Sequence, residues 1–412
     1  MTTGDSTGSL SSRGHGMLAG GFASYIDAHV ARQDDPGYVS LAIAENLQMF
    51  DLLGPRLESF PPVPPRVVGY DANAGRQVIR EAIAGLVGRR MFGRAIDPAH
   101  VGVLSGASAV LEAMAFVLGD PGDGVLVPTP SYAGFWPDLG ARAGLEVVGV
   151  PTRAEDGYRL TPDMLDRARA DAGRPTPILL LTNPDNPRGQ VRDRDEVEAL
   201  IAWAEDRGVH VIADEVYGLT VFGEGTDFAS VGRLRPSLGD HLHVVWAVSK
   251  DFGMSGLRCG AVVTENEPLR NAIELQGIWT GVSSLAQHAI AAMLADDAWV
   301  DTYLDAMRDR LGGLAATVSR ALTAADVPHL PPTAGFFVLC DLREWLAEPT
   351  VEAEHALWQR ILDEADVNLT PGSALRAPDP GIFRLCYAAN PPEVVADAVT
   401  RVATVLQDIR RA

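Results

Sequence analysis

The chain has 412 residues, of which 47% are hydrophobic and 21% charged, and its formal charge is −20. This composition is typical of a globular protein larger than one ordinary domain, and the excess negative charge argues against a nucleic-acid partner. No apolar run approaches the ~20 residues that cross a membrane. The polar start, which we expect to be frayed, lacks the apolar segment of a signal peptide, so we expect a cytoplasmic protein.

Short apolar runs alternate with helical patterns through the middle of the chain, including helices expected over Ala109–Leu118 and Asp193–Arg207. The strands are expected at Val101–Leu104, Gly124–Val127, Glu146–Val150, Ile178–Leu181, His210–Ala213, His243–Ala247 and Cys259–Val263. Strands that alternate with helices predict an α/β fold with a mainly parallel sheet, in which ligands bind at the carboxyl ends of the strands.

The pattern changes after about Asp301. An amphipathic helix over Thr302–Leu322 is followed by PPTAGFFVLCDL, by the strand IFRLCYA and by a terminal helix, which together predict a smaller α/β domain. We expect residues 66–304 to form the large domain. Residues 1–65 and 305–412 are expected to form the small domain.

Two rare residue types are informative. The cysteines, Cys259, Cys340 and Cys386, lie far apart in apolar runs, so we expect buried thiols and neither disulfides nor a metal site. Of the 34 basic side chains only one, Lys250, is a lysine, and it follows the apolar run HLHVVWAV. Arginine stays protonated and cannot form an imine, whereas a desolvated lysine can attack an aldehyde. A single lysine also arises by chance, but the surrounding motifs favour a chemical role.

Small residues follow the first expected strand of the large domain. Gly106, Ala107 and Ser108 precede a helix, and the free N–H groups at a helix N-terminus can bind phosphate. A tightly packed turn is the alternative reading. Further along the chain, Tyr132 in PTPSYAGF offers an aromatic face for stacking.

Polar residues follow two further strands. Asn186 lies in NPDNPRG after an apolar run, Asp214 ends the strand HVIAD, and Tyr217 comes three residues later. An amide, a carboxylate and a phenol at neighbouring strand ends can contact the nitrogen and the oxygen substituent of an aromatic cofactor ring. A turn at Asn186 and a helix cap at Asp214 are the alternatives.

Two arginines complete the set. Arg258 follows Ser249 and Lys250 closely, and its guanidinium can hold a phosphate through two hydrogen bonds. Arg384 lies in the apolar run IFRLCYA, where a charge needs a partner. The carboxylate of a substrate fits that need, and an internal aspartate or glutamate is the alternative.

The order of these residues resembles that of fold-type I enzymes dependent on pyridoxal phosphate (PLP), of the aspartate aminotransferase superfamily, over nearly the whole chain. The resemblance implies a large domain with a mainly parallel seven-stranded sheet, a smaller α/β domain, and a homodimer in which Gly281–His288 reaches the phosphate of the neighbour. It implies that Lys250 binds the PLP aldehyde, Asp214 pairs with the ring nitrogen, and Arg384 binds the substrate carboxylate. The other implied PLP contacts are Ala107, Ser108, Ser249, Arg258 and Tyr70 at the phosphate, Tyr132 at the ring face, and Asn186 and Tyr217 at the ring oxygen.

A narrower resemblance concerns the reaction. The segments LAIAENLQMFDLL, SKDFGMSGLRCG and LTPGSALRAPDPGIFRLCYA are similar to those of 1-aminocyclopropane-1-carboxylate (ACC) synthases. Glu45 falls on the glutamate associated in that family with S-adenosylmethionine (SAM), and a carboxylate attracts a sulfonium cation in a pocket of low dielectric. A surface or capping glutamate is the alternative. The resemblance implies that Lys250 removes the α-proton of SAM and that the Cγ–S bond breaks with release of methylthioadenosine.

Several positions depart from the ACC synthase pattern. Pro137 replaces an arginine of the motif FDRD, Asn73 replaces a tyrosine, Ala247 replaces a phosphate-binding serine, and the order Asn-Gln-Leu has become Asn46-Leu47-Gln48. Because these changes spare the core PLP contacts but alter the outer pocket, we expect a replacement or ring-forming product with a second substrate at least as readily as ACC. A plain aminotransferase is the main alternative. A second alternative is a non-catalytic regulatory protein of the same fold. Such proteins carry an added DNA-binding extension, whereas the residues before the large domain here match the N-terminal segment of the enzymes.

Overall fold

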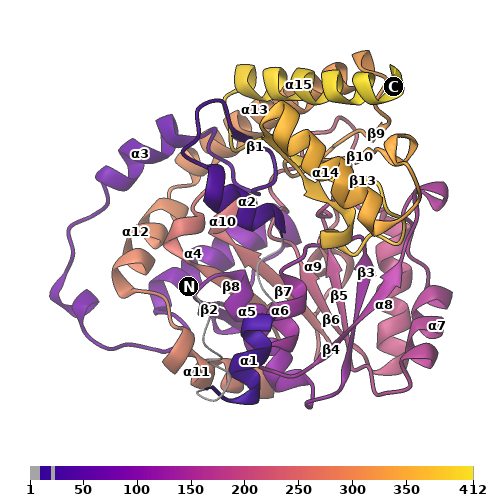
Figure 1. The fold of residues 1–412 in the computed structure, drawn as a ribbon. Helices are drawn as coiled ribbons and strands as arrows, with labels where there is room; N and C mark the ends of the chain where they lie inside the picture. Colours follow the sequence, from indigo (N-terminus) through magenta and orange to yellow (C-terminus); the bar gives the residue numbers. More distant parts are fainter. Residues whose placement is uncertain (1–9, 20–23, 412) are drawn as a thin grey trace.

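The computed structural model describes residues 10–19 and 24–411. Its centre is a seven-stranded sheet in the order β2-β8-β7-β6-β5-β3-β4 (Figure 1). The strands are β2 (Val101–Leu104), β3 (Gly124–Thr129), β4 (Glu146–Pro151), β5 (Ile178–Thr182), β6 (His210–Asp214), β7 (Leu242–Ala247) and β8 (Gly260–Thr264). Only β8 runs antiparallel to its neighbours, so the predicted α/β fold with a mainly parallel sheet is confirmed.

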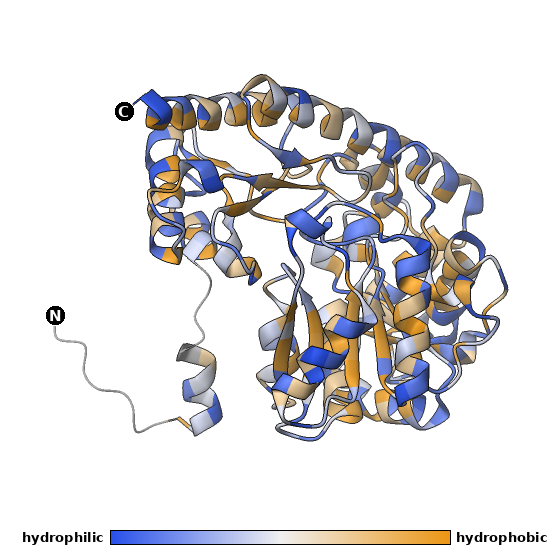
Figure 2. Cartoon of the chain, turned by 90° about the vertical axis from the view of Figure 1, so that its right-hand side faces the viewer, coloured by the Kyte–Doolittle hydropathy of each residue, from blue (hydrophilic) through white to orange (hydrophobic). Residues whose placement is uncertain are grey.

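The apolar character of these strands follows from helices that pack on both faces of the sheet. Strands β3, β5 and β7 are buried throughout, whereas β4, at the edge, is mostly not. In Figure 2 the strands are predominantly hydrophobic and the surrounding helices carry polar residues on their outer sides. The helices of this part of the chain are α4 (Gln77–Val87), α5 (Ala107–Leu118), α6 (Phe135–Gly140), α7 (Pro162–Ala172), α8 (Arg194–Arg207), α9 (Val231–Leu234), α10 (Val248–Asp251), α11 (Glu267–Thr280) and α12 (Ser284–Leu294).

The carboxyl ends of β5, β6 and β7 meet at one edge of the sheet. Thr182, the last residue of β5, lies beside Asp214, the last residue of β6, and Asp214 lies beside Val245 of β7. Strand β7 passes directly into α10, a single turn that carries Lys250. The parallel register therefore places Asp214 and Lys250 at the same edge, where ligands bind in sheets of this kind.

A smaller antiparallel sheet in the order β12-β13-β10-β9 lies beyond this edge (Figure 1). Its strands are β9 (His329–Leu330), β10 (Phe337–Asp341), β12 (Thr370–Pro371) and β13 (Ile382–Cys386), and the helices of this part are α13 (Asp297–Ala324), α14 (Val351–Ala365) and α15 (Pro392–Arg411). The domain boundaries stay a prediction, and α13 runs unbroken through the expected boundary at residue 304.

The segment before residue 66 lies against the C-terminal part of the chain. Strand β1 (Val39–Ser40) pairs in parallel with β11 (Val367–Asn368), and the amide of Cys386 donates to the carbonyl of Leu41 at 2.6 Å. Two helices flank β1 in the chain, α2 (Ser24–Arg32) and α3 (Phe50–Glu58). The residues that follow β1, including Glu45, are thereby held close to the edge of the large sheet that carries Lys250.

Two expectations need correction. The polar start was expected to be frayed, yet its described part contains α1 (Ser12–Ala19), because the Ser11 hydroxyl accepts a hydrogen bond from the amide of Gly14 at 3.2 Å. Residues 1–9 lie outside the described part of the chain. The long helix expected from Thr302 begins at Asp297, because the Asp296 carboxylate caps it by accepting from the amide of Trp299 at 3.1 Å.

The three cysteines are buried and free, as expected from their spacing. Among the residues that the structure describes, no helix combines the length and the apolar character needed to span a bilayer.

Candidate active site

A cavity of about 160 Å³ lies at the carboxyl edge of the large sheet. It is lined by Ala107, Ser108, Leu111, Tyr132, Phe135, Asp138, Thr182, Asn186, Asp214, Val216, Tyr217, Ala247, Ser249, Lys250, Ser255 and Arg258. These residues come from five separate segments of the chain, and the set includes most of the candidates singled out in the sequence. Three candidates, Tyr70, Glu45 and Arg384, are not part of this lining.

Lys250 is one of the residues that line the cavity. Its Nζ donates a hydrogen bond to the carbonyl oxygen of Ala44, 2.7 Å away. Burial lowers the pKa of this amine to about 8, with smaller effects from Cys386, which raises it, and Glu45, which raises it. The lowered pKa increases the fraction of the amine that is neutral near physiological pH. The neutral amine is the form that attacks an aldehyde or accepts a proton.

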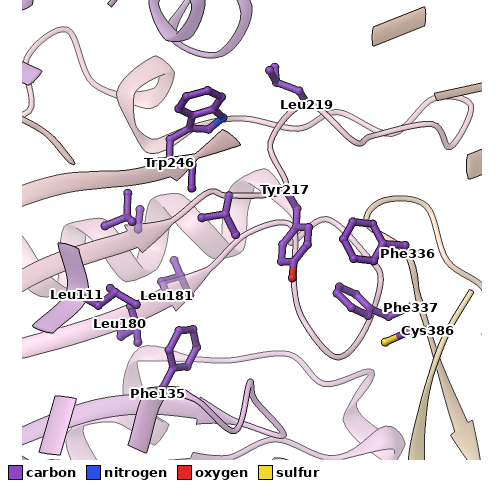
Figure 3. Close-up of a cluster of buried hydrophobic side chains, with 14 of the residues drawn as sticks. Leu111, Phe135, Leu180, Leu181, Tyr217, Leu219, Trp246, Phe336, Phe337 and Cys386 are labelled. Carbon is purple, nitrogen blue, oxygen red and sulfur yellow. The ribbon is translucent and has the colours of Figure 1, made fainter. Parts of the chain in front are cut away.

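Asp214 is a buried carboxylate on the same wall. Its only hydrogen bond among the described residues comes from the amide of Val216 at 3.4 Å, and burial raises its pKa to about 7. A carboxylate in this state is stabilised by a cationic partner within the cavity. Tyr217 lies three residues later, with its ring packed edge-on against Phe336 and Phe337, at centroid distances of 5.4 and 5.2 Å (Figure 3).

The turn before α5 and the turn before β8 meet at one end of the cavity. Gly106 has φ +93°, and a Cβ atom there would lie 2.7 Å from Nη2 of Arg258. Arg258 itself has a left-handed backbone, with φ +47°. Only glycine leaves room for the guanidinium beside the free N–H groups of Ala107 and Ser108, so the fold builds a concave anion site here.

Arg384 is 2% exposed and lies behind the cavity wall. It donates to the side-chain oxygen of Asn186 at 3.0 Å, to the carbonyl of Ala42 at 2.7 Å and to the hydroxyl of Thr370 at 3.1 Å. Its Nε is buried without a partner, and no acidic side chain of the described ranges forms an ion pair with it. The internal aspartate or glutamate partner considered from the sequence is thus not found among these residues.

Glu45 approaches the cavity from the segment that follows β1. Its Oε1 accepts a hydrogen bond from the hydroxyl of Ser255, which lines the cavity, at 2.8 Å. The side chain is half-buried, so the carboxylate lies near the rim of the cavity. Tyr132 also lies on the wall, and its ring packs edge-on against Phe135 at 5.3 Å.

Tyr70 is not brought to the cavity of its own chain. Its side chain is fully exposed, as is much of the segment around it. The segment Gly281–His288 lies near the turn before α5, because the hydroxyl of Ser105 donates to the carbonyl of Gly281 at 2.9 Å. Any contact of Tyr70 or of this segment with a neighbouring subunit stays a prediction.

Three polar lining residues carried no role in the sequence interpretation. Thr182 ends β5, so the rule that ligands bind at strand ends was sufficient to find it. Asp138 and Ser255 lie in short helical turns, where no periodic pattern marks them. Burial raises the pKa of Asp138 to about 6, and its Oδ2 has no hydrogen-bond partner among the described residues. Of the departures noted in the sequence, Ala247 lines the cavity, whereas Pro137 is exposed on α6.

These features fit PLP. The anion site at Gly106 and Arg258 suits its phosphate. Asp214 is a buried carboxylate that forms no ion pair among the described residues, and a protonated pyridine nitrogen would balance its charge. The amine of Lys250 is available for the aldehyde on the same wall.

Comparisons with known proteins agree with this fit. The family profile described as aminotransferase class I and II matches residues 65–402. The chain is 31% identical to 1-aminocyclopropane-1-carboxylate synthase 6 of Arabidopsis thaliana, over 94% of this chain and 83% of that protein. It is 33% identical to 1-aminocyclopropane-1-carboxylate synthase 4 of Oryza sativa subsp. japonica, over 93% and 85% of the two chains.

Among solved structures, an aspartate aminotransferase double mutant of Thermus thermophilus matches with a TM-score of 0.81 and 26% identity, over 96% of this chain and 99% of that one. The fold, the cavity and these matches lead to one conclusion. The chain belongs to the aminotransferase class I and II family, and it is a fold-type I, PLP-dependent enzyme similar to ACC synthases.

Proposed function

We propose that this protein cleaves SAM between Cγ and sulfur, with loss of the α-proton and release of methylthioadenosine. The observation that carries the proposal is the carboxylate of Glu45, held at the cavity rim by the hydroxyl of Ser255 at 2.8 Å. A carboxylate beside a partly dry cavity attracts a sulfonium cation more strongly than it would in water. The relatives named as ACC synthases support the same choice of substrate.

Different residues of the chain would bind the phosphate, the aldehyde and the ring of the cofactor. When bound, PLP supplies an aldehyde for Lys250 and an electron-withdrawing ring that stabilises negative charge at the substrate Cα. Arg258 and Ser249, with the amides of Ala107 and Ser108, hold the phosphate. Tyr132 covers one face of the ring.

Three further residues set the charge and the orientation of the cofactor ring. Asp214 holds the proton on the ring nitrogen, and the hydroxyl of Tyr217 contacts the ring oxygen. Asn186 contacts the same oxygen. Because its amide oxygen accepts from Arg384, its amide nitrogen faces the cavity as a donor.

The reacting groups of the substrate are positioned by Arg384, Glu45 and Lys250. Arg384 binds the α-carboxylate, which supplies the acidic partner that the buried guanidinium lacks among the described residues. The neutral amine of Lys250 accepts the α-proton as a general base, since burial lowers its pKa to about 8. Glu45 faces the sulfonium, and the Cγ–S electron pair leaves with the sulfur as neutral methylthioadenosine.

The fate of the four-carbon remainder distinguishes two products. Bond formation between Cα and Cγ gives ACC. Attack of a second small molecule on this remainder gives a substituted or ring-forming product. Because Pro137 and Asn73 depart from the ACC synthase pattern, we expect that outcome at least as readily as ACC.

We further propose that the active enzyme is a homodimer. Tyr70 is fully exposed on its own chain, next to the exposed Val68, and a subunit interface would bring it to the phosphate of the neighbouring site. Exposed apolar side chains of α11, Leu275, Ile278 and Trp279, add apolar surface of the kind that dimer interfaces bury.

Incubation of the purified holoenzyme with SAM, followed by mass spectrometry of all products, tests the proposal. Release of methylthioadenosine together with ACC identifies an ACC synthase. Release that requires an added cell extract identifies a reaction with a second substrate. Conversion of PLP to its amino form by an ordinary amino acid, with no methylthioadenosine from SAM, refutes the proposal in favour of an aminotransferase. Lys250→Ala is the inactive control.

A further inference from the structure

Ser255 occupies a position between two expected binding groups. It opens the short 3-10 turn Ser255–Leu257, which lies between Lys250 and Arg258 in the chain. Its hydroxyl donates to Oε1 of Glu45 at 2.8 Å, and its carbonyl oxygen accepts from Nη1 of Arg258 at 3.0 Å. One residue thus touches both the guanidinium of the anion site and the carboxylate at the rim.

The segment that carries Glu45 lies directly along the lysine loop. The carbonyl of Ala44 accepts from Nζ of Lys250 at 2.7 Å. Gly253 has φ +63°, and a Cβ atom there would lie 2.5 Å from the carbonyl oxygen of Asn46. The backbone on both sides of Glu45 is therefore fixed, and the rotation of its side chain is the remaining freedom.

The hydroxyl of Ser255 removes that freedom. A glutamate side chain has several staggered rotamers, and a hydrogen bond from the half-buried hydroxyl of Ser255 selects one of them. No arginine, lysine or histidine of the described residues forms an ion pair with Glu45, so its charge is not already neutralised by a neighbouring side chain. A carboxylate that is held by a hydrogen bond and forms no ion pair among the described residues is suited to a cation supplied by the substrate.

We infer that Ser255 is a specificity-determining residue, which holds Glu45 in the rotamer that faces the sulfonium of the substrate. The inference rests on the proposed function, because it needs a cationic substrate at the rim. Ser255 acts through Glu45 and is a positioning residue. The interaction selects sulfonium compounds over the corresponding thioethers, which lack the positive charge together with one methyl group on sulfur.

The test compares SAM with S-adenosylhomocysteine, its uncharged thioether, through the change that each causes in the absorbance of bound PLP. Ser255→Ala is expected to weaken SAM binding about tenfold, the loss typical of one hydrogen bond to a charged group, and to leave thioether binding nearly unchanged. For SAM turnover the same variant is expected to raise KM far more than it lowers kcat. Ser255→Thr keeps the hydroxyl and should restore both values.

A double-mutant cycle separates a specific link from a general disturbance. In the Glu45→Gln background, Ser255→Ala should have no further effect on the preference for SAM. Ser237→Ala is the matched control, because it removes a hydrogen bond of the same kind, from the Ser237 hydroxyl to the Glu265 carboxylate, at a place away from the cavity. Additive effects of Ser255→Ala and Glu45→Gln, or equal losses for SAM and the thioether, overturn the inference.

Measurements on the wild-type enzyme distinguish a failure of the proposed function from a failure of the role inferred for Ser255. If it releases methylthioadenosine from SAM but shows no coupling between Ser255 and Glu45, the proposed function stands and this inference fails. If it releases none, yet binds SAM more tightly than the thioether in a way that depends on Ser255, the proposed function fails and the inference stands.

Discussion

The guanidinium of Arg384 donates a hydrogen bond to the side-chain oxygen of Asn186, with 3.0 Å between Nη1 and Oδ1. Arg384 belongs to β13 of the small sheet, whereas Asn186 follows β5 of the large one. The contact joins the proposed site of the substrate carboxylate to the proposed contact with the cofactor ring. With these proposed roles, one buried hydrogen bond would link substrate binding to cofactor orientation.

Replacement of this arginine should separate activity from stability. Arg384→Met is expected to lower kcat/KM by about a thousandfold, because a buried interaction with the substrate carboxylate is lost. The free energy of unfolding should stay the same or rise by about 1 kcal/mol, since the guanidinium is buried without an acidic partner among the described residues. Kinetics and thermal unfolding measure the two effects. Arg343→Met, which removes a guanidinium paired with Asp341, is the control that keeps activity. Unaltered kinetics for Arg384→Met would contradict the assignment.

The ionisation of Lys250 should govern how fast the protein takes up PLP. Its pKa is lowered to about 8, so the neutral fraction should rise roughly tenfold per pH unit below that value and level off above it. The initial rate at which the apoprotein gains visible absorbance with PLP, measured from pH 6 to about pH 10, checks this. Because Lys250 is the only lysine, Lys250→Ala should show no such absorbance at any pH. A rate that still rises steeply at pH 10 would indicate an ordinary exposed amine.

Tyr70 should matter for cofactor binding although it does not line the active-site cavity of its own chain. If it donates to the phosphate of the neighbouring subunit, Tyr70→Phe should weaken PLP affinity by about tenfold, the value of one hydrogen bond to a charged group. Because the side chain is fully exposed, the unfolding free energy of each subunit should barely change. Equilibrium titration with PLP measures the affinity, and sedimentation measures the association state. Phe116→Leu alters another exposed aromatic residue and serves as control. A monomeric enzyme with full activity would rule out this role.

One buried and one half-buried histidine, His243 and His210, lie at the opposite edge of the large sheet and should set the acid limit of stability. His210 Nδ1 lies 3.0 Å from His243 Nε2, and His243 Nδ1 lies 2.8 Å from the hydroxyl of Thr264. Burial lowers the pKa of His210 to about 4 and that of His243 to about 3, with a further lowering from the neighbouring histidines. The folded state therefore holds both rings neutral, whereas the unfolded chain protonates them near pH 6.5.

Acid is therefore expected to destabilise the folded state through these two histidines. Because the unfolded state binds more protons, stability falls as the pH drops below about 6.5, and the loss continues toward the folded pKa values near 4 and 3. We expect a loss on the order of 3 kcal/mol between pH 6.5 and pH 4 from this pair. Denaturant unfolding across this range, compared between the wild type and His243→Leu, measures it. His355→Gln changes an exposed ring and should leave the slope unchanged; an identical slope in His243→Leu would disprove the explanation.

The sequence by itself determined the fold class and the order of the cofactor residues. Alternating β-branched and helical segments are a local property, and each expected strand of the large sheet appears within one or two residues of its predicted bounds. Lys250 was found because it is the only lysine of the chain, and Asp214 because it ends a strand. Parallel strands bring their carboxyl ends to one edge whatever lies between them, so the two residues were expected to lie close together.

Only the tertiary structure decided which side chains touch across long separations in the chain. Ser255 and Glu45 are 210 residues apart, and Arg384 and Asn186 are 198 apart, so no local pattern pairs them. Asp138 faces the cavity because of how one short helix packs, not because of a motif. Tyr70 does not reach the cavity of its own chain, although the family resemblance implied a contact with the phosphate. The position of an exposed side chain depends on the surfaces that pack around it, and local sequence periodicity does not reveal those surfaces.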